Sequence, residues 1–153
     1  MGQVEDRLAG IGRTVPEVAA PVAVYVPAVR SGRLVFTSGQ LPLRDGALIG
    51  TGRVGAEVTA ESARAMAAQC ALNAIAAIRS VVGDLDEVVR VVKVVGYVAS
   101  HPSFTGQPAV VNGASELLGV AFGPAGQHAR SAVGVAVLPL DAPVEVEVVV
   151  ETV

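Results

Sequence analysis

The sequence predicts an α+β protein with the element order β-β-α-β-α-β-β, in which two helices pack against one face of a mixed sheet. Valine-rich runs of strand character lie near residues 25–38, 88–98 and 130–150. An alanine-rich stretch of helical periodicity separates the first run from the second. At 153 residues we expect one domain, 1–153, in which residues 1–20 form an N-terminal extension.

The first predicted elements are a short helical turn at residues 4–9 and a β-hairpin. Residues 25–30 form the first strand, and Pro27 places it near a sheet edge because proline cannot donate a ladder hydrogen bond. A turn at 30–33 leads into the second strand at 34–38. Four glycines between residues 44 and 56 indicate a surface loop.

A long helix is predicted over residues 60–82 because alanine has the highest helix propensity. Thr59 can cap its first turn, Glu61 suits the positive end of the helix dipole, and Gly83 can end it. Small side chains on its apolar stripe would allow close packing on a sheet. The stripe consists of Ala67, Cys70, Ala71, Ala74, Ile75, Ile78 and Val82.

The second half of the chain alternates strand and helix. Nearly continuous valine at residues 88–98 predicts a strand with a bulge at Gly96. Residues 107–118 predict a second helix. Residues 130–137 and 144–150 predict two further strands joined by the turn LPLDAP, and we expect these two strands to be neighbours in the sheet.

Composition narrows the classes of function. The chain is 52% apolar, 16% charged and 3% aromatic, so we expect part of its surface to be buried in an oligomer. A net charge of −3 without a basic stripe gives no support to nucleic-acid binding. The single cysteine, Cys70, fits a reducing compartment. With no secretory leader and no charge-free apolar run of about 18 residues, we expect a cytoplasmic protein with no membrane partner.

The candidate site lies in the last two predicted strands. Arg130 opens one strand, and Glu145 and Glu147 share one face of the other because side chains alternate along a strand. The valines around these glutamates then face the helices. Two interpretations remain open. One is a solvated sheet face with a weak cross-strand pair. The other is a site where Arg130 binds a carboxylate bidentately and a glutamate handles a proton or a water molecule.

Three other places in the sequence have a structural interpretation, and two of them also have a functional one. The corner of Ser38 and Gly39 is an ordinary strand exit, or a place where the missing side chain lets the backbone approach a ligand. Tyr25 is a tethered core ring or a pocket wall. Asn112, inside a helix, is expected to be an exposed or capping residue.

The sequence gives no positive signal for a metal or a cofactor. His101 and His128 lie far apart and lack Cys or Glu partners, so no metal is expected. Cys70 lies on the apolar helix stripe and is expected to be a core residue rather than a nucleophile. No nucleophile elbow, phosphate loop or dinucleotide fingerprint is present.

Three segments together resemble the RidA/YjgF family of reactive-intermediate deaminases. They are YVPAVRSGRLVFTSGQLP at 25–42, VVRVVKVVGYV at 88–98, and RSAVGVAVLP at 130–139 followed by VEVE at 144–147. The resemblance runs from about residue 25 to residue 151. It implies a chorismate-mutase-like fold and a homotrimer with sites between subunits. It also implies hydrolysis of small enamines and imines, such as 2-aminoacrylate, to a keto acid and ammonia.

The resemblance also implies residue roles. Arg130 matches the arginine that binds the substrate carboxylate, and Glu145 matches the glutamate that orients the attacking water. An imine is already electrophilic, so neither a nucleophile nor a metal is required. The matching substrate-binding positions are Tyr25, Ser38, Gly39, Asn112 and Ala132.

The chain departs from the family pattern at several places. Ala132 stands where many members carry cysteine, and His128 stands where proline is common. A glycine-rich insertion lies near residues 119–127. These departures are typical of a divergent subgroup with a reshaped pocket. The alternative to a 2-iminopropanoate or 2-iminobutanoate deaminase is a non-catalytic trimeric protein that binds a small carboxylate metabolite through Arg130.

Overall fold

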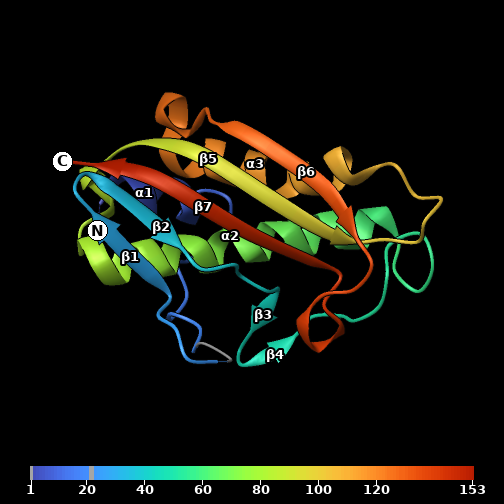
Figure 1. Ribbon diagram of the computed structural model, residues 1–153. Helices are drawn as coiled ribbons and strands as arrows, with labels where there is room; N and C mark the ends of the chain where they lie inside the picture. The colour runs from blue at the N-terminus through green and yellow to red at the C-terminus, as the bar shows by residue number, and fades with distance from the viewer. Residues whose placement is uncertain (1, 21–22) are drawn as a thin grey trace.

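The chain forms a five-stranded mixed sheet in the order β1-β2-β7-β5-β6 (Figure 1). It is described by a computed structural model that covers residues 2–20 and 23–153. Strands β5 and β6 run parallel, and the other neighbouring pairs are antiparallel. The predicted α+β class is confirmed. The strands are β1 (Ala28–Ser31), β2 (Leu34–Thr37), β5 (Val88–Ala99), β6 (Ala129–Val135) and β7 (Val144–Thr152), with a separate hairpin of β3 (Leu43–Arg44) and β4 (Ala47–Leu48).

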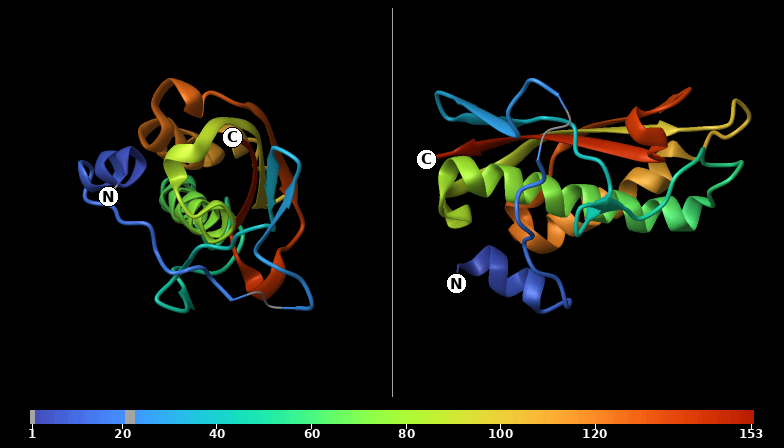
Figure 2. Two further views of the ribbon diagram at one scale, coloured as in Figure 1. Left: turned by 90° about the vertical axis from the view of Figure 1, so that its left-hand side faces the viewer. Right: turned by 90° about the horizontal axis from the view of Figure 1, so that it is seen from below.

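Two long helices, α2 (Ala60–Val82) and α3 (Gln107–Phe122), cover one face of the sheet, as predicted. Figure 2 shows these helices on one side of the sheet and a short helix, α1 (Gln3–Ala9), outside them. Short 3-10 turns lie at Leu85–Glu87, Gly123–Gly126 and Pro139–Asp141. The second face of the sheet carries no helix from the residues that the structure describes.

Helix α2 is the central element of the core. Thr59 Oγ1 accepts a hydrogen bond from Ser62 N at 3.1 Å, and Gly83 ends the helix at a positive φ of 79°. Among the described residues, α2 is also the one helix long and apolar enough to cross a membrane by length and composition. Its most apolar window is 67% buried inside the protein. Packing between the sheet and α3 therefore accounts for its apolar character.

Helix α1 joins the same core. Its first two backbone N–H groups, of Gln3 and Val4, donate to the Asp86 carboxylate at 2.9 and 3.2 Å. Leu8 is fully buried, and Arg7 Nη1 donates to the carbonyl of Ala121 in α3 at 3.3 Å. The turn predicted at residues 4–9 is thus a docked helix.

Strand β7 divides its side chains between the two faces, as the alternation predicts. Val144, Val146 and Val148 are fully buried on the helix side. Glu145 and Glu147 occupy the other face, which we call the outer face of the sheet. The prediction for these strand faces is confirmed.

Three local predictions are wrong. The bulge predicted at Gly96 is not formed, because Gly96 pairs in register with Val146 and Ala132, and the irregularities of the β5–β7 ladder lie between Val88 and Lys93. The first strand begins at Ala28 rather than at Tyr25, because residues before Pro27 leave the ladder and bend away. The glycine-rich region 44–56 contains β4 and part of β3, which form a small hairpin around a turn at Asp45 and Gly46.

The prediction that the two C-terminal strands are neighbours is also wrong. Strand β5 lies between β6 and β7 and pairs with both. The connection between β6 and β7 contains a 3-10 turn in which Leu140 and Asp141 adopt positive φ. This connection crosses the end of β5 instead of closing a tight hairpin.

Candidate functional site

The Arg130 side chain points from the edge strand β6 towards α3. In the parallel register Arg130 is aligned with Val94, whose side chain is buried on the helix side. Arg130 Nη1 donates to Asn112 Oδ1 at 2.8 Å and to Ser115 Oγ at 3.2 Å, and Nη2 donates to the carbonyl of Pro108 at 3.3 Å. Asn112, expected from its place in a helix to be an exposed or capping residue, is instead in direct contact with Arg130.

Glu145 lies in a second cluster, on the outer face of the sheet. A cleft of about 50 Å³ is lined by Tyr25, Gly39, Gln40 and Glu145, together with neighbouring apolar residues. That volume holds a few water molecules or the end of a small metabolite. The sequence-predicted residues Tyr25, Gly39 and Glu145 thus meet at one place.

Gly39 is held against Glu145 by the backbone. The next residue, Gln40, exchanges backbone hydrogen bonds with Val146 of β7 at 2.8 and 3.0 Å. A Cβ atom at Gly39 would lie 2.7 Å from Glu145 Cδ and still closer to its Oε1 atom. Any side chain at this corner would therefore displace the Glu145 carboxylate.

The environment of Glu145 favours its neutral form. Burial raises the pKa of the Glu145 carboxyl, and the nearby charge of Glu147 raises it further. Tyr97, the cross-strand neighbour of Glu145, donates from its hydroxyl to Glu147 Oε1 at 3.0 Å. Burial and then the Glu147 contact also raise the pKa of the Tyr97 hydroxyl. Sequence reasoning missed Tyr97, although its place beside Glu145 follows once β5 is known to pair with β7.

The two clusters do not share a site within one chain. Arg130 is on the helix side of the sheet and Glu145 is on the outer face. They are separated by one intervening strand and by three residues along the strands. Ordinary strand spacing and rise place their Cα atoms about 14 Å apart. An Arg130–Glu145 salt bridge within the chain is thereby excluded.

The remaining predicted positions lie at the borders of these clusters. Ser38 donates from its hydroxyl to the carbonyl of Val26 at 2.6 Å, and so ties the segment after Tyr25 to the strand exit. Ala132 lies two residues beyond Arg130 on the same face of β6 and packs against the core. Cys70 is fully buried on α2, as predicted for a core residue.

Two polar residues near Arg130, Ser115 and His128, were not predicted from the sequence as site residues. Ser115 Oγ lies 2.9 Å from His128 Nε2 and also accepts from Arg130. Ser115 follows Asn112 by three residues, a spacing that places both on one helix face and could have identified it. Within 2–20 and 23–153, no three His, Cys, Asp or Glu side chains are grouped so that they could hold a metal ion.

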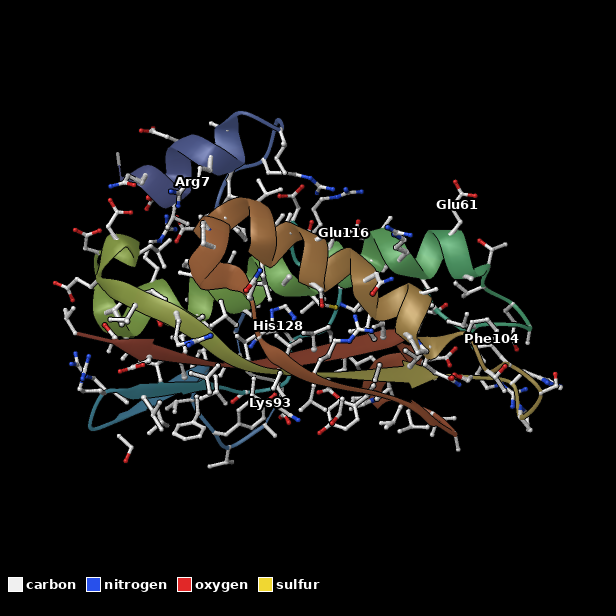
Figure 3. All side chains as sticks on the ribbon, turned by 90° about the horizontal axis from the view of Figure 1, so that it is seen from above. Arg7, Glu61, Lys93, Phe104, Glu116 and His128 are labelled. Carbon is white, nitrogen blue, oxygen red and sulfur yellow. The ribbon has the colours of Figure 1, made fainter. Side chains whose placement is uncertain are left out.

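The outer face of the sheet exposes apolar side chains. Val29, Leu34, Phe36 and Val133 are between 37% and 52% exposed, and their strand registers place them on the same face as Glu145. Lys93 lies on this face as well, away from the helices, whereas His128 lies beneath α3 (Figure 3). Val29, Leu34 and Phe36 lie together on the paired strands β1 and β2, and an exposed apolar patch is typical of an interaction site.

Comparison with known proteins agrees with this architecture. Residues 5–152 match the family described as "YjgF/chorismate mutase-like, putative endoribonuclease". The chain belongs to the YjgF family. Because this family match spans nearly the whole chain, the resemblance predicted from the sequence is confirmed.

Several known proteins are similar to this chain over nearly its whole length. Protein TCP17 of Trypanosoma cruzi is 46% identical and is covered over 94% of its length by 98% of this chain. The crystal structure of Atu1372, a protein of unknown function from Agrobacterium tumefaciens, is 43% identical with a TM-score of 0.91, over 98% of this chain and 92% of that one. A structure titled "putative endoribonuclease" from Shewanella oneidensis is 34% identical with a TM-score of 0.95, over 98% and 99%.

Proposed function

We propose that the protein hydrolyses small enamine and imine intermediates of amino acid metabolism, in sites shared between copies of a homotrimer. The observation that carries this proposal is the division of the chemistry between two places. The chain has an arginine, Arg130, on the helix side of the sheet and a half-buried glutamate, Glu145, on the other side. Two copies can bring them together, whereas one chain cannot.

The outer face of the sheet supports association with further copies. Its exposed valine, leucine and phenylalanine side chains would be covered in an oligomer, and the hydrophobic effect favours that burial. Arg130 lies on the edge strand β6, where its guanidinium is reachable from outside the chain. Association would place this edge beside the Glu145 cleft of a neighbour.

Each group then has one role. Arg130 would bind the substrate carboxylate through charge-assisted hydrogen bonds. Glu145 of the neighbouring copy would accept a proton from a water molecule as that water attacks the imine carbon. As the C–O bond forms, the C=N π bond breaks and the nitrogen takes the proton held by Glu145, which gives a carbinolamine. Glu145 then transfers the carbinolamine hydroxyl proton to the same nitrogen, so that the C–N bond breaks, ammonia leaves and the C=O bond of the keto acid forms.

The raised pKa of Glu145 suits this use. A base whose pKa is closer to neutral removes a proton from water more effectively than an ordinary carboxylate. Holding the carboxylate and the water in place would supply most of the remaining acceleration. A ribonuclease activity has less support, because the net charge of −3 gives little attraction for a phosphate backbone.

The test is release of ammonia and pyruvate from 2-aminoacrylate generated in the assay by β-elimination. We expect the protein to accelerate release and both Arg130→Ala and Glu145→Ala to abolish the acceleration. Full activity in both variants would overturn the assigned roles. Thermal stabilisation by pyruvate without turnover would instead identify a binding protein that uses the same arginine.

A further inference from the structure

The guanidinium of Arg130 ends a chain of hydrogen bonds that runs under α3 to the residues before β6. Arg130 Nη1 donates to Ser115 Oγ at 3.2 Å, and Ser115 Oγ lies 2.9 Å from His128 Nε2. His128 Nδ1 lies 2.6 Å from the carbonyl oxygen of Gly126. All three side chains are half-buried, and His128 sits on the sheet side of α3 in Figure 3.

The direction of each bond follows from which groups can donate. A carbonyl oxygen accepts only, so His128 Nδ1 must carry a proton. In the neutral ring Nε2 is then an acceptor, and it takes the hydroxyl proton of Ser115. Arginine donates only, so Ser115 must present a lone pair to Arg130 Nη1. His128 thereby fixes the orientation of the Ser115 hydroxyl.

The same contacts decide which edge of the guanidinium remains available. Both N–H groups of Nη1 are used, one by Asn112 and one by Ser115, and Nη2 gives one to Pro108. No other acceptor among the described residues bonds to Arg130. The Nε proton and one Nη2 proton have no acceptor among the described residues, and these two neighbouring nitrogens can bind a carboxylate bidentately.

We propose that Ser115 and His128 are positioning residues that orient Arg130 for the carboxylate of the substrate. This role rests on the proposed function of Arg130, and neither residue touches the substrate. Proline, which is common in the family at the position of His128, offers no side-chain acceptor. In this chain, therefore, the His128 imidazole orients the Ser115 hydroxyl, and that hydroxyl accepts a hydrogen bond from Arg130.

The hydrogen-bond chain can be tested without any ligand, because the protein has two histidines and the other one is an internal control. Ser103 N donates to His101 Nδ1 at 3.1 Å, so neutral His101 carries its proton on Nε2. In ¹⁵N spectra of the histidine-labelled full chain at pH 8, we expect one ring protonated at Nδ1 and one at Nε2. His101→Gln should remove the Nε2-protonated ring. Two Nε2-protonated rings would overturn the proposal.

The functional test measures binding of pyruvate and of its neutral amide to the full-length protein. Ser115→Ala and His128→Leu should weaken pyruvate binding about three- to tenfold, as expected for loss of one supporting hydrogen bond, and leave the amide unaffected. Ser115→Thr and His128→Gln keep the hydroxyl and an acceptor, so they should restore binding. Ser103→Ala, which breaks the matched Ser–His contact at His101, should change nothing.

In turnover assays Ser115→Ala and His128→Leu should raise KM and leave kcat within about twofold of the wild-type value. Both variants disturb ground-state binding more than the chemical step. Arg130→Ala separates this inference from the proposed function. If wild type binds pyruvate no better than Arg130→Ala does, the proposed function fails. If Arg130→Ala loses binding while Ser115→Ala and His128→Leu retain it, the positioning role alone is overturned.

Discussion

The Arg130 cluster and the Glu145 cluster differ in how complete they are within one chain. Arg130 is held by acceptors from α3 that fix its plane and leave one edge available. Glu145 lies on the outer face of the sheet, in a small cleft beside exposed apolar side chains. The chain itself therefore fixes the orientation of Arg130. The environment of Glu145, in contrast, is completed only by the copy that covers the outer face in the proposed trimer.

Because of this difference, the proposed site cannot be identified by looking for oppositely charged side chains that lie close together within one chain. Strand alternation sends Glu145 outwards, whereas the register of β6 sends Arg130 towards α3. A cleft that needs both groups must use one from each of two copies. In the proposed trimer, the outer face would serve as both an interface and a catalytic surface.

The largest expected effect comes from the preorganised side. Arg130→Ala removes two charge-assisted hydrogen bonds to the substrate carboxylate, so kcat/KM should fall about a hundred- to ten-thousand-fold. Arg130→Lys keeps the charge but loses the planar fork, and should recover little of the activity. Steady-state kinetics with in-situ generated 2-aminoacrylate measure both. A fully active lysine variant would show that charge alone suffices.

The next largest effect is expected at Glu145, on the face that contacts the neighbouring copy in the proposed trimer. Glu145→Gln keeps the shape but removes the base, so kcat should fall about a hundredfold or more with little change in pyruvate affinity. It should also raise the melting temperature at pH 7, because burial penalises the ionised carboxylate there. Below pH 4.5, where the ordinary carboxyl is protonated too, this stabilisation should disappear. A melting-temperature gain that is the same at both pH values would contradict the burial argument.

The pH dependence of the rate tests whether Glu147 acts on Glu145. The working form of Glu145 is ionised, so the rate should rise with pH through a midpoint above 4.5. Glu147→Gln removes the nearby negative charge that helps to raise the pKa of Glu145, and the acid limb should move to lower pH. Glu151→Gln, on the same face but further along β7, is the matched control. Equal shifts in both variants would contradict a specific coupling.

The smallest expected effect is at the corner opposite Glu145. Gly39→Ala adds a Cβ atom against the Glu145 carboxylate, and the carboxylate must move to relieve the contact. We expect kcat to fall about tenfold while pyruvate affinity, set by Arg130, stays unchanged. Gly119→Ala, where an added Cβ meets nothing and φ is not positive, controls for a glycine-to-alanine change without such a contact. Unchanged kcat in Gly39→Ala would place the reacting water elsewhere.

Local patterns predicted much of this molecule. The alanine stripe of α2 and the alternation of β7 are short-range signals, and both faces came out as expected. The strand order was not predictable in this way, because placing β5 between β6 and β7 depends on pairing between distant residues. That difference separates Arg130 from Glu145 by one strand, and the registers of β6 and β7 place the two side chains on opposite faces of the sheet.

The candidate site was predicted in its parts but not in its assembly. Strand position and alternation identified Arg130 and Glu145, the resemblance added a binding role for Asn112, and Arg130 and Asn112 do touch. The Ser115–His128 contact spans 13 positions without a periodic pattern, so it becomes visible once α3 and β6 are placed together.

Mixing two inactive variants tests the shared site most directly. Arg130→Ala and Glu145→Gln, unfolded together and refolded at equal concentrations, form mixed trimers in which an intact Arg130 of one copy can face an intact Glu145 of the next. Random assembly should then restore about a quarter of the wild-type sites, and about that share of the activity, since each mixed cyclic trimer contains one complete site. Each variant refolded alone should stay inactive. A mixture no more active than its separately refolded components, with mixed trimers verified by mass spectrometry, would contradict a site built from two copies.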